Sequence, residues 1–369
     1  MSDAGRSAMI PITKTVLGTD EQRAVERVLG SGWILQGPEV AAFEQELAAF
    51  AGAPGGVAVS SGTAALHLGL MALGIGAGDE VITVSHSFIA TANAIRLVGA
   101  RPVFVDIEPN TLNLDARLLA AALTPRTRAL LCVHQLGMPC DLDAIGAFAD
   151  AHGLPLVEDA ACALGSTYGG ARIGAPRGAL ATFSFHPRKI LTTGDGGFVT
   201  SRNAALLERI RCLRQHGTLD GTTFVEVGFN YRMTDLQAAI GRTQLDRLPA
   251  LLAERREQVE RYRALLIGRQ GVVFPVEPEG CRGNWQSLAL RLPGLDTRPM
   301  VRDLNRQGIG VRGGITNAHE QPAYAGWPHG PLPCSERASV ETLMLPLYPG
   351  LTDEEQRRVC GSIDGLLPQ

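Results

Sequence analysis

The sequence predicts an α/β protein in which a mostly parallel sheet is flanked by helices. Short apolar strands are expected at 57–60, 80–84, 102–105, 128–133 and 154–158, separated by helical stretches at 62–74, 88–98, 115–122 and 141–151. Strands that are apolar throughout are buried on both faces, and the helices between them make the crossovers of a parallel or mixed sheet. Further strands at 181–184 and 197–200 and a helix at 203–213 extend the same unit.

The length of 369 residues suggests two or three domains. Two amphipathic helices are expected within residues 19–51. After Thr234 and Asp235, a plausible N-cap, a long helical pattern begins that Pro249 should kink or break. Beyond it the pattern predicts a strand at 287–292, helices at 298–307 and 352–366, and a Pro/Gly-rich loop at 321–333. We therefore predict a large domain over 1–245, with an N-terminal helical lead-in, and a smaller C-terminal α+β domain over 246–369.

Composition excludes several classes of protein. A net charge of −3, with arginines interleaved with glutamates, argues against nucleic-acid binding. No apolar run of 18 residues predicts a membrane span, and the first residues lack the apolar stretch of a signal peptide, so a cytoplasmic protein is expected. The seven cysteines form no CxxC pair and the histidines form no HExxH, so we expect neither a disulfide framework nor a bound metal.

The basic residues are distributed unusually. Of the 34 basic residues only Lys14 and Lys189 are lysines. An arginine cannot lose its proton in a protein, whereas a lysine amine can act as a nucleophile or base. Lys14 reads as a solvated cation. Lys189 lies in FSFHPRKILTTGDGG beside His186 and Arg188, cationic neighbours that favour a neutral amine, and it is the candidate nucleophile.

Three features of the large domain suit one cofactor. Ser60-Ser61-Gly62-Thr63 opens a helix after a strand, where free amides attract an anion, although an ordinary helix cap explains it as well. Asp159 ends an apolar strand, where a carboxylate can hold a ring nitrogen protonated, although it could simply cap the next turn. Lys189 supplies an amine, although its loop could bind an anion without chemistry. Together they indicate pyridoxal 5'-phosphate (PLP), with Phe88 available to stack on its ring.

Several long motifs resemble one family in the correct order. They include SSGTAALHLGLMALGIGAGDEVI, LVEDAACALGS, FSFHPRKILTTGDGGFV and GFNYRMTDLQAAIGRTQL. These are similar to the DegT/StrS-type sugar aminotransferases, and the resemblance covers almost the whole chain. It implies a fold-type-I PLP transferase with the aspartate-aminotransferase architecture.

The resemblance also implies residue roles. Lys189 would form the Schiff base with PLP and move the proton, Asp159 would pair with the pyridine nitrogen, and Phe88 would stack on the ring. The phosphate would be held by a set of small and polar residues, namely Gly62, Thr63 and Ser184, with Asn230 from the neighbouring subunit of a homodimer. Cys162 departs from the Gln or His found in many members, which puts its contact with the cofactor in doubt because a thiol bonds weakly. The candidates for substrate contact are His86, Gln135 and His319. Residues 284–287 form another such segment, for which a structural role is slightly preferred.

The expected activity is transfer of an amino group from glutamate or glutamine to a keto sugar carried on a nucleotide. An acceptor that is a cyclitol ketone stays open, as does a non-catalytic regulatory or binding protein with the same fold. A sugar dehydratase of this fold is disfavoured, because those members replace the Schiff-base lysine with His. No GxGxxG motif follows a strand, which argues against a nicotinamide oxidoreductase.

Overall fold

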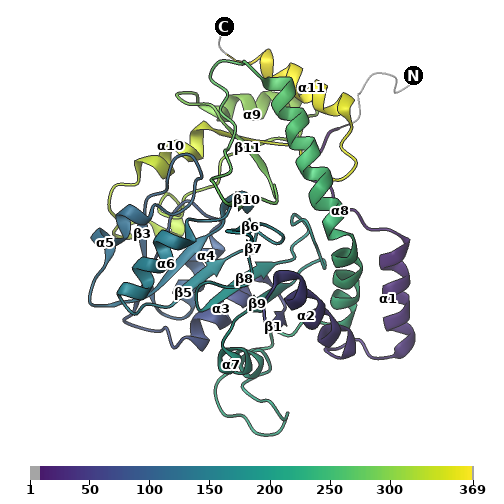
Figure 1. Cartoon of the computed structure of the whole chain (residues 1–369), viewed down its shortest axis with the longest axis vertical. Coiled ribbons are helices and arrows are strands. Elements are labelled where there is room, and N and C mark those ends of the chain that lie inside the picture. The colour runs from purple at the N-terminus through teal and green to yellow at the C-terminus, as the bar shows by residue number, and fades with distance from the viewer. Residues whose placement is uncertain (1–8, 368–369) are drawn as a thin grey trace.

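A computed structural model of the chain describes residues 9–367. The large sheet lies in the lower half of the molecule and a smaller sheet with its helices lies above it (Figure 1). The large sheet has seven strands in the spatial order β1 (Gly56–Val59), β9 (Gly197–Thr200), β8 (Leu180–Ser184), β5 (Leu156–Asp159), β4 (Thr127–Val133), β2 (Glu80–Val84) and β3 (Arg101–Val105). Only β9 runs antiparallel to its two neighbours, so the predicted α/β class and mostly parallel sheet are confirmed.

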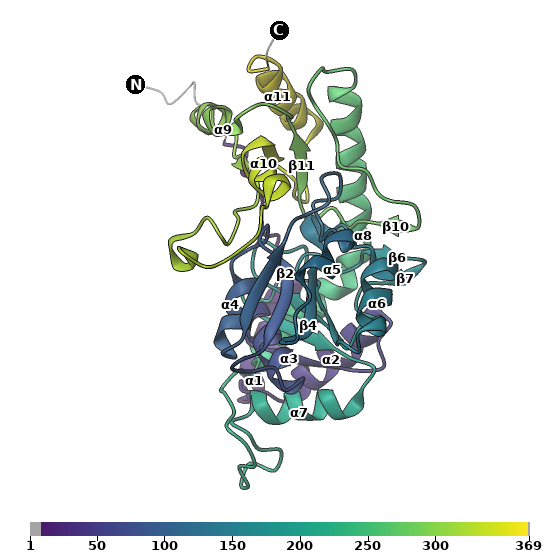
Figure 2. The ribbon, with the colours of Figure 1, turned by 90° about the vertical axis from the view of Figure 1, so that its left-hand side faces the viewer.

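Helices cover the large sheet, and Figure 2 shows them from the side. They are α2 (Pro38–Ala51), α3 (Gly62–Ala72), α4 (Ala90–Leu97), α5 (Leu119–Ala122), α6 (Leu142–Ala151) and α7 (Ala204–Arg214), while α1 (Thr19–Ser31) packs on α8 (Asp235–Leu266). Short 3₁₀ turns lie at Ala116–Leu118 and Gln135–Gly137. The expected elements are therefore present with small differences at their ends.

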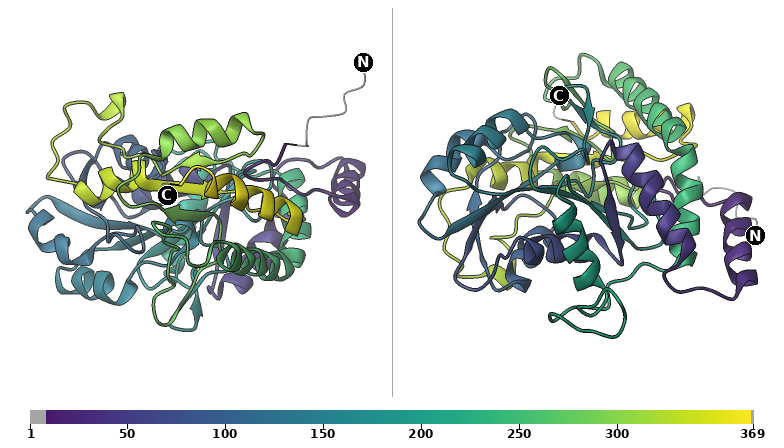
Figure 3. Two further views of the ribbon diagram at one scale, coloured as in Figure 1. Left: turned by 90° about the horizontal axis from the view of Figure 1, so that it is seen from above. Right: turned by 60° about the horizontal axis from the view of Figure 1, so that its bottom comes forward.

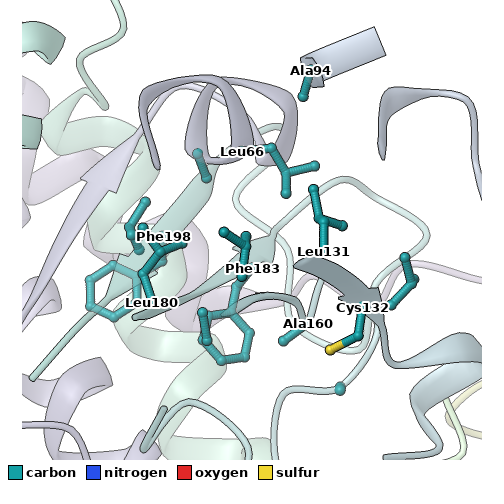
Figure 4. Close-up of a cluster of buried hydrophobic side chains, with 14 of the residues drawn as sticks. Leu66, Ala94, Leu131, Cys132, Ala160, Leu180, Phe183 and Phe198 are labelled. Atoms are coloured by element: carbon teal, nitrogen blue, oxygen red, sulfur yellow. The ribbon is translucent and has the colours of Figure 1, made fainter. Parts of the chain in front are cut away.

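The core of the large domain forms where α3 and α4 pack on the strands. Figure 4 shows Leu66 of α3 and Ala94 of α4 on the same side of the sheet as Leu131 of β4, whereas the ring of Phe183 of β8 points to the opposite side. All four side chains are almost completely buried. Such burial of apolar surface contributes about 25 cal/mol per Å², and it fixes the ends of the strands on which a site can be built.

The smaller unit has its own core. Its sheet has the order β11 (Leu288–Arg291), β13 (Thr342–Leu345) and β12 (Arg312–Gly313), covered by α9 (Thr297–Arg306), α10 (Pro333–Glu341) and α11 (Asp353–Asp364). The last helices lie across the top of the molecule in the left view of Figure 3. A third small sheet pairs β10 (Cys281–Arg282) with β6 (Thr167–Tyr168), which also pairs with β7 (Ala171–Arg172).

Two local findings differ from expectation. The helix α8 runs unbroken through Pro249, because Leu248 is buried in the first core and Val259 in the second, so packing on both sides offsets the lost hydrogen bond. The predicted loop at 321–333 does contain a short 3₁₀ turn, Pro322–Tyr324, and α10 and β13, which follow it directly, were not predicted.

The two cores meet along α8, and the proposed division at residue 245 stays a prediction. Leu245 and Leu248 belong to the first core, whereas Val259 and the residues after it belong to the second. Ile10, at the other end of the chain, is also buried in the second core. Within residues 9–367, no helix is long and apolar enough to cross a membrane.

Candidate active site

The candidate site lies at the carboxyl ends of β5 and β8, where open α/β sheets bind their ligands. Asp159 is the last residue of β5 and pairs in register with Thr182 of the parallel strand β8. Ser184 ends β8, and the loop that follows carries Lys189. The fold thus gathers on one edge three residues that were expected to act together.

The start of α3 forms a narrow cradle against the end of β8. Ser61 is the N-cap, and its hydroxyl accepts a hydrogen bond from Ala64 N–H at 3.1 Å. A Cβ added to Gly62 would lie 2.7 Å from Cβ of Ser184, so only glycine fits there. The first amides of a helix have no acceptor within the helix, and those of Gly62 and Thr63 therefore suit an anion beside the Ser184 hydroxyl. The motif can therefore serve both as a helix cap, through Ser61, and as an anion site, through the amides of Gly62 and Thr63.

Asp159 is held by donors from two elements. Thr91 Oγ1 of α4 donates to Oδ2 at 2.8 Å, and Ala161 N–H donates to Oδ1 at 3.1 Å. Burial raises the pKa of Asp159, and these two hydrogen bonds and the charge of Lys189 oppose the rise. Thr91 was not among the predicted site residues. It lies in SFIATANAI, on the first turn of α4, but nothing in the sequence marked it as a partner of Asp159.

Lys189 lies in a loop rather than in a helix or strand, and its side chain is half-buried. Its Nζ donates to Sγ of Cys162 at 3.0 Å. Cys162 follows Asp159 by three residues, so the lysine amine and the carboxylate belong to one cluster. Arg188 and His186, expected to act on the lysine, are exposed to solvent.

Phe88 and Asn230 lie at the surface. Phe88 is 72% exposed and stands three residues before Thr91, with its carbonyl accepting from Thr91 N–H at 3.1 Å. Asn230 is exposed at the end of the loop that follows α7, which projects from the molecule in Figure 1. In the described residues no contact joins Asn230 to Lys189 or Asp159, and its expected role toward a neighbouring subunit stays a prediction.

The three candidate substrate residues lie in the interior. His86 is fully buried, and its Nδ1–H donates to Oδ1 of Asn317 at 2.8 Å. Gln135 is also buried and donates to the carbonyl oxygen of His86. Nδ1 of His319 and Oγ of Ser85 form a hydrogen bond at 2.6 Å, and the His319 side chain is 5% exposed. His86 and Gln135 follow the carboxyl ends of β2 and β4, on the same edge of the sheet as Asp159, and any contact of the three residues with a substrate stays a prediction.

A buried carboxylate, a half-buried lysine and an anion cradle thus lie on one sheet edge, which are the groups that chemistry through an amine requires. The chain belongs to the DegT/DnrJ/EryC1/StrS aminotransferase family, whose model matches residues 16–364. It is therefore an aminotransferase, as the sequence motifs predicted.

Individual relatives agree with this assignment. The spore coat polysaccharide biosynthesis protein SpsC of Bacillus subtilis (strain 168) is 40% identical over 370 residues, with 95% of each chain covered. The structure of S. venezuelae DesV in complex with a ketimine intermediate has a TM-score of 0.93 and 38% identity, covering 98% of this chain and 99% of that one. The structure of DesI in the presence of its TDP-sugar product has a TM-score of 0.90 and 34% identity, covering 97% and 92%. The predicted fold-type-I architecture is thereby confirmed.

Proposed function

We propose that this aminotransferase uses PLP to move an amino group from glutamate or glutamine to a keto sugar carried on a nucleotide. The observation that carries the proposal is the cluster of Lys189, Asp159 and the Gly62–Ser184 cradle at one edge of the sheet. The cradle is too narrow for a side chain at Gly62 and presents helix amides and a hydroxyl, which are groups that bind phosphate. The residues present fit PLP.

When bound, PLP supplies an electron sink for the bonds to the reacting carbon. Lys189 Nζ would be its covalent attachment point. The same amine would then carry a proton between the substrate carbon that bears the amino group and the cofactor carbon that receives it. Asp159 would face the ring nitrogen and hold a proton there, with Thr91 and Ala161 keeping its carboxylate oriented. Phe88, exposed beside α4, would cover one face of the ring.

The substrate class is supported by the relatives and by the site. DesI was crystallised in the presence of a TDP-sugar product, and SpsC carries a name in polysaccharide biosynthesis. A homodimer is part of the proposal, because Asn230 is exposed at the base of the loop after α7, where it pairs with Gln215, and could contact a neighbouring site from there. A cyclitol ketone as acceptor is the second candidate, and the interior position of His86, Gln135 and His319 favours neither acceptor.

Absorbance spectroscopy of the purified protein with L-glutamate tests the cofactor and the donor. We expect a visible band that moves to shorter wavelength on adding glutamate in the wild type and in Lys14→Ala, whose side chain is exposed. In Lys189→Ala the band should be missing and turnover lost. A band that responds only to glutamine assigns that donor instead, and no band after adding PLP contradicts the cofactor.

The acceptor is tested by the second half of the reaction. Protein first converted with glutamate is mixed with nucleotide-linked keto sugars that differ in keto position, and with cyclitol ketones. Return of the visible band reports transfer to that acceptor. Return with cyclitols alone would replace the keto-sugar proposal with the second candidate.

A further inference from the structure

A side chain of the small domain contacts both peptide groups that flank Lys189. Gln286 Nε2 donates to the carbonyl oxygen of Arg188 at 2.6 Å, and its Oε1 accepts from Ile190 N–H at 3.1 Å. The first bond holds the peptide plane before the Cα of Lys189, and the second holds the plane after it. The orientations of these two planes set the backbone angles φ and ψ of Lys189.

Other hydrogen bonds also restrain the Lys189 loop. Lys189 N–H donates to the carbonyl oxygen of His186 at 2.8 Å, Arg188 N–H donates to Nδ1 of His186 at 3.2 Å, and Thr15 Oγ1 donates to the carbonyl oxygen of Pro187 at 3.0 Å. Neither a helix nor a strand ladder includes the residues of this loop. An amine that must meet a bound carbon needs a defined backbone beneath its flexible stem, since small displacements of reacting groups cost large factors in rate. Gln286 supplies two of the hydrogen bonds that define it.

Gln286 is itself fixed by its neighbours. Its N–H donates to Oδ1 of Asn284 at 2.8 Å, and its carbonyl accepts from Nη1 of Arg255 at 3.4 Å. Arg255 is buried in α8, and burial lowers its pKa to about 10. Nη1 of Arg255 also donates to the carbonyl of Trp285, whose φ of 54° lies in the left-handed region. A strained residue held by a buried cation is typical of a segment whose position matters.

The same segment reaches the other side of the cluster. Nδ2 of Asn284 donates to the carbonyl oxygens of Cys162 and Leu164, at 2.8 and 2.9 Å. Residues 284–286 therefore bind the loop that follows Asp159 and the loop that carries Lys189. The contact between Lys189 Nζ and Cys162 Sγ links these same two loops directly.

We infer that Gln286 is a positioning residue for Lys189, which couples the placement of the catalytic amine to the small domain. The inference rests on the proposed role of Lys189. It assigns a task in the reaction to a segment whose sequence alone favoured a purely structural role.

The test compares two variants with a matched control. Gln286→Met keeps the length of the side chain and removes both hydrogen bonds, while Gln307→Met makes the same change at an exposed position of the small domain. We expect Gln286→Met to attach PLP and to turn over about tenfold more slowly, with an unchanged KM for the amino donor and a melting temperature close to that of the wild type. Gln307→Met should match the wild type throughout.

Gln286→Glu separates positioning from a general structural role. A protonated carboxyl can accept from Ile190 N–H and donate to the carbonyl of Arg188, as the amide does, whereas an ionised one cannot donate. The rate of PLP attachment relative to wild type should therefore rise as the pH falls through the titration of the introduced group. A constant ratio, or Gln286→Met turning over like wild type, overturns the inference. If wild type itself attaches no PLP, it is the proposed function that fails.

Discussion

Nζ of Lys189 lies 3.0 Å from Sγ of Cys162, and this contact joins the loops that follow β8 and β5. The thiol stands where many relatives were expected to carry Gln or His. It is a weaker acceptor than an amide oxygen or an imidazole nitrogen, so it holds the lysine loosely. In the proposed reaction the amine can therefore leave this partner at small cost in free energy.

Replacement of Cys162 should accordingly have a small effect. We expect Cys162→Ala to keep its PLP and to lose less than about tenfold in turnover, because a weak hydrogen bond contributes about 1 kcal/mol or less. Cys281→Ala, which removes another half-buried thiol, is the control and should match the wild type. Steady-state kinetics of the three proteins measures this, and a loss as severe as that of Lys189→Ala would show that the thiol takes part in the chemistry.

Thr91 should strengthen cofactor binding, because its partner Asp159 is buried and water cannot replace the hydrogen bond. Thr91→Val keeps the shape of the side chain and removes the donor to Oδ2 of Asp159. Loss of a hydrogen bond to a buried charged group costs about 1–3 kcal/mol, so we expect PLP to bind about tenfold more weakly or worse. The dissociation constant is measured by titrating cofactor-free protein with PLP.

Thr200→Val is the matched control for that experiment. Its hydroxyl is buried in β9 and makes no hydrogen bond in the described residues, so its removal leaves no partner unsatisfied. The affinity for PLP should be unchanged and the protein should unfold at the same or a higher temperature. Equal losses of affinity in both variants would refute the role given to Thr91.

His86 should make the stability of the protein depend on pH. Oδ1 of Asn317 accepts from Nδ1–H, while Nε2 is buried with no partner in the described residues. Burial lowers the pKa of His86 to about 4. Since the unfolded chain binds this proton near pH 6.5, stability is fully present above that pH. It falls as the pH drops from 6.5 to 4, by about 3 kcal/mol for this group.

Chemical denaturation of wild type and His86→Asn across this pH range provides the measurement. The introduced amide can still donate to Asn317 but does not titrate, so the variant should lose less stability on acidification. His152→Asn, at an exposed position, should keep the wild-type dependence. If the free energy of unfolding falls equally with pH in wild type and His86→Asn, other groups cause the loss of stability in acid.

The projecting loop after α7 should form part of the dimer interface. Val225 and Val227 in this loop are 71% and 83% exposed, and Leu219 and Phe224 of the same loop are exposed as well, so apolar side chains gather here as they do on a surface that a partner covers. Substituting both with Asp should convert a dimer to a monomer in sedimentation velocity and weaken the retention of PLP, because Asn230 would no longer reach a neighbouring site. Ile267→Asp, whose parent side chain is 79% exposed beyond the end of α8, is the control and should stay dimeric. A double variant that remains a dimer with full cofactor would place the interface elsewhere.

Much of the fold could be predicted because its signals are local. Short apolar runs predict the strands that are buried on both faces, and the stretches between these runs predict the helices. Asp159 became a candidate site residue because it stands at the end of such a run. Lys189 was identified by the scarcity of lysine. Thr91 was missed, and the segment that holds Gln286 was expected to be structural, because their partners lie far along the chain, at 68 residues for Asp159 and 98 for Arg188, and only packing brings them together.

Pro249 and His86 show what the local sequence does not predict. A proline inside a helical pattern predicts a break, yet burial of α8 against both cores keeps the helix continuous. The complete burial of His86 is likewise not reported by any local pattern, and its contact with a substrate stays a prediction.

The position of Ile10 limits how the two units can move. Its N–H donates to Gly308 in the small domain, and Gly310 N–H donates back to it. A few residues later Thr15 Oγ1 donates to the carbonyl of Pro187, before the chain enters α1 beside α8. The polypeptide thus crosses between the two cores twice, once here and once along α8. Two such connections restrict rotation of one core relative to the other more than a single connection would.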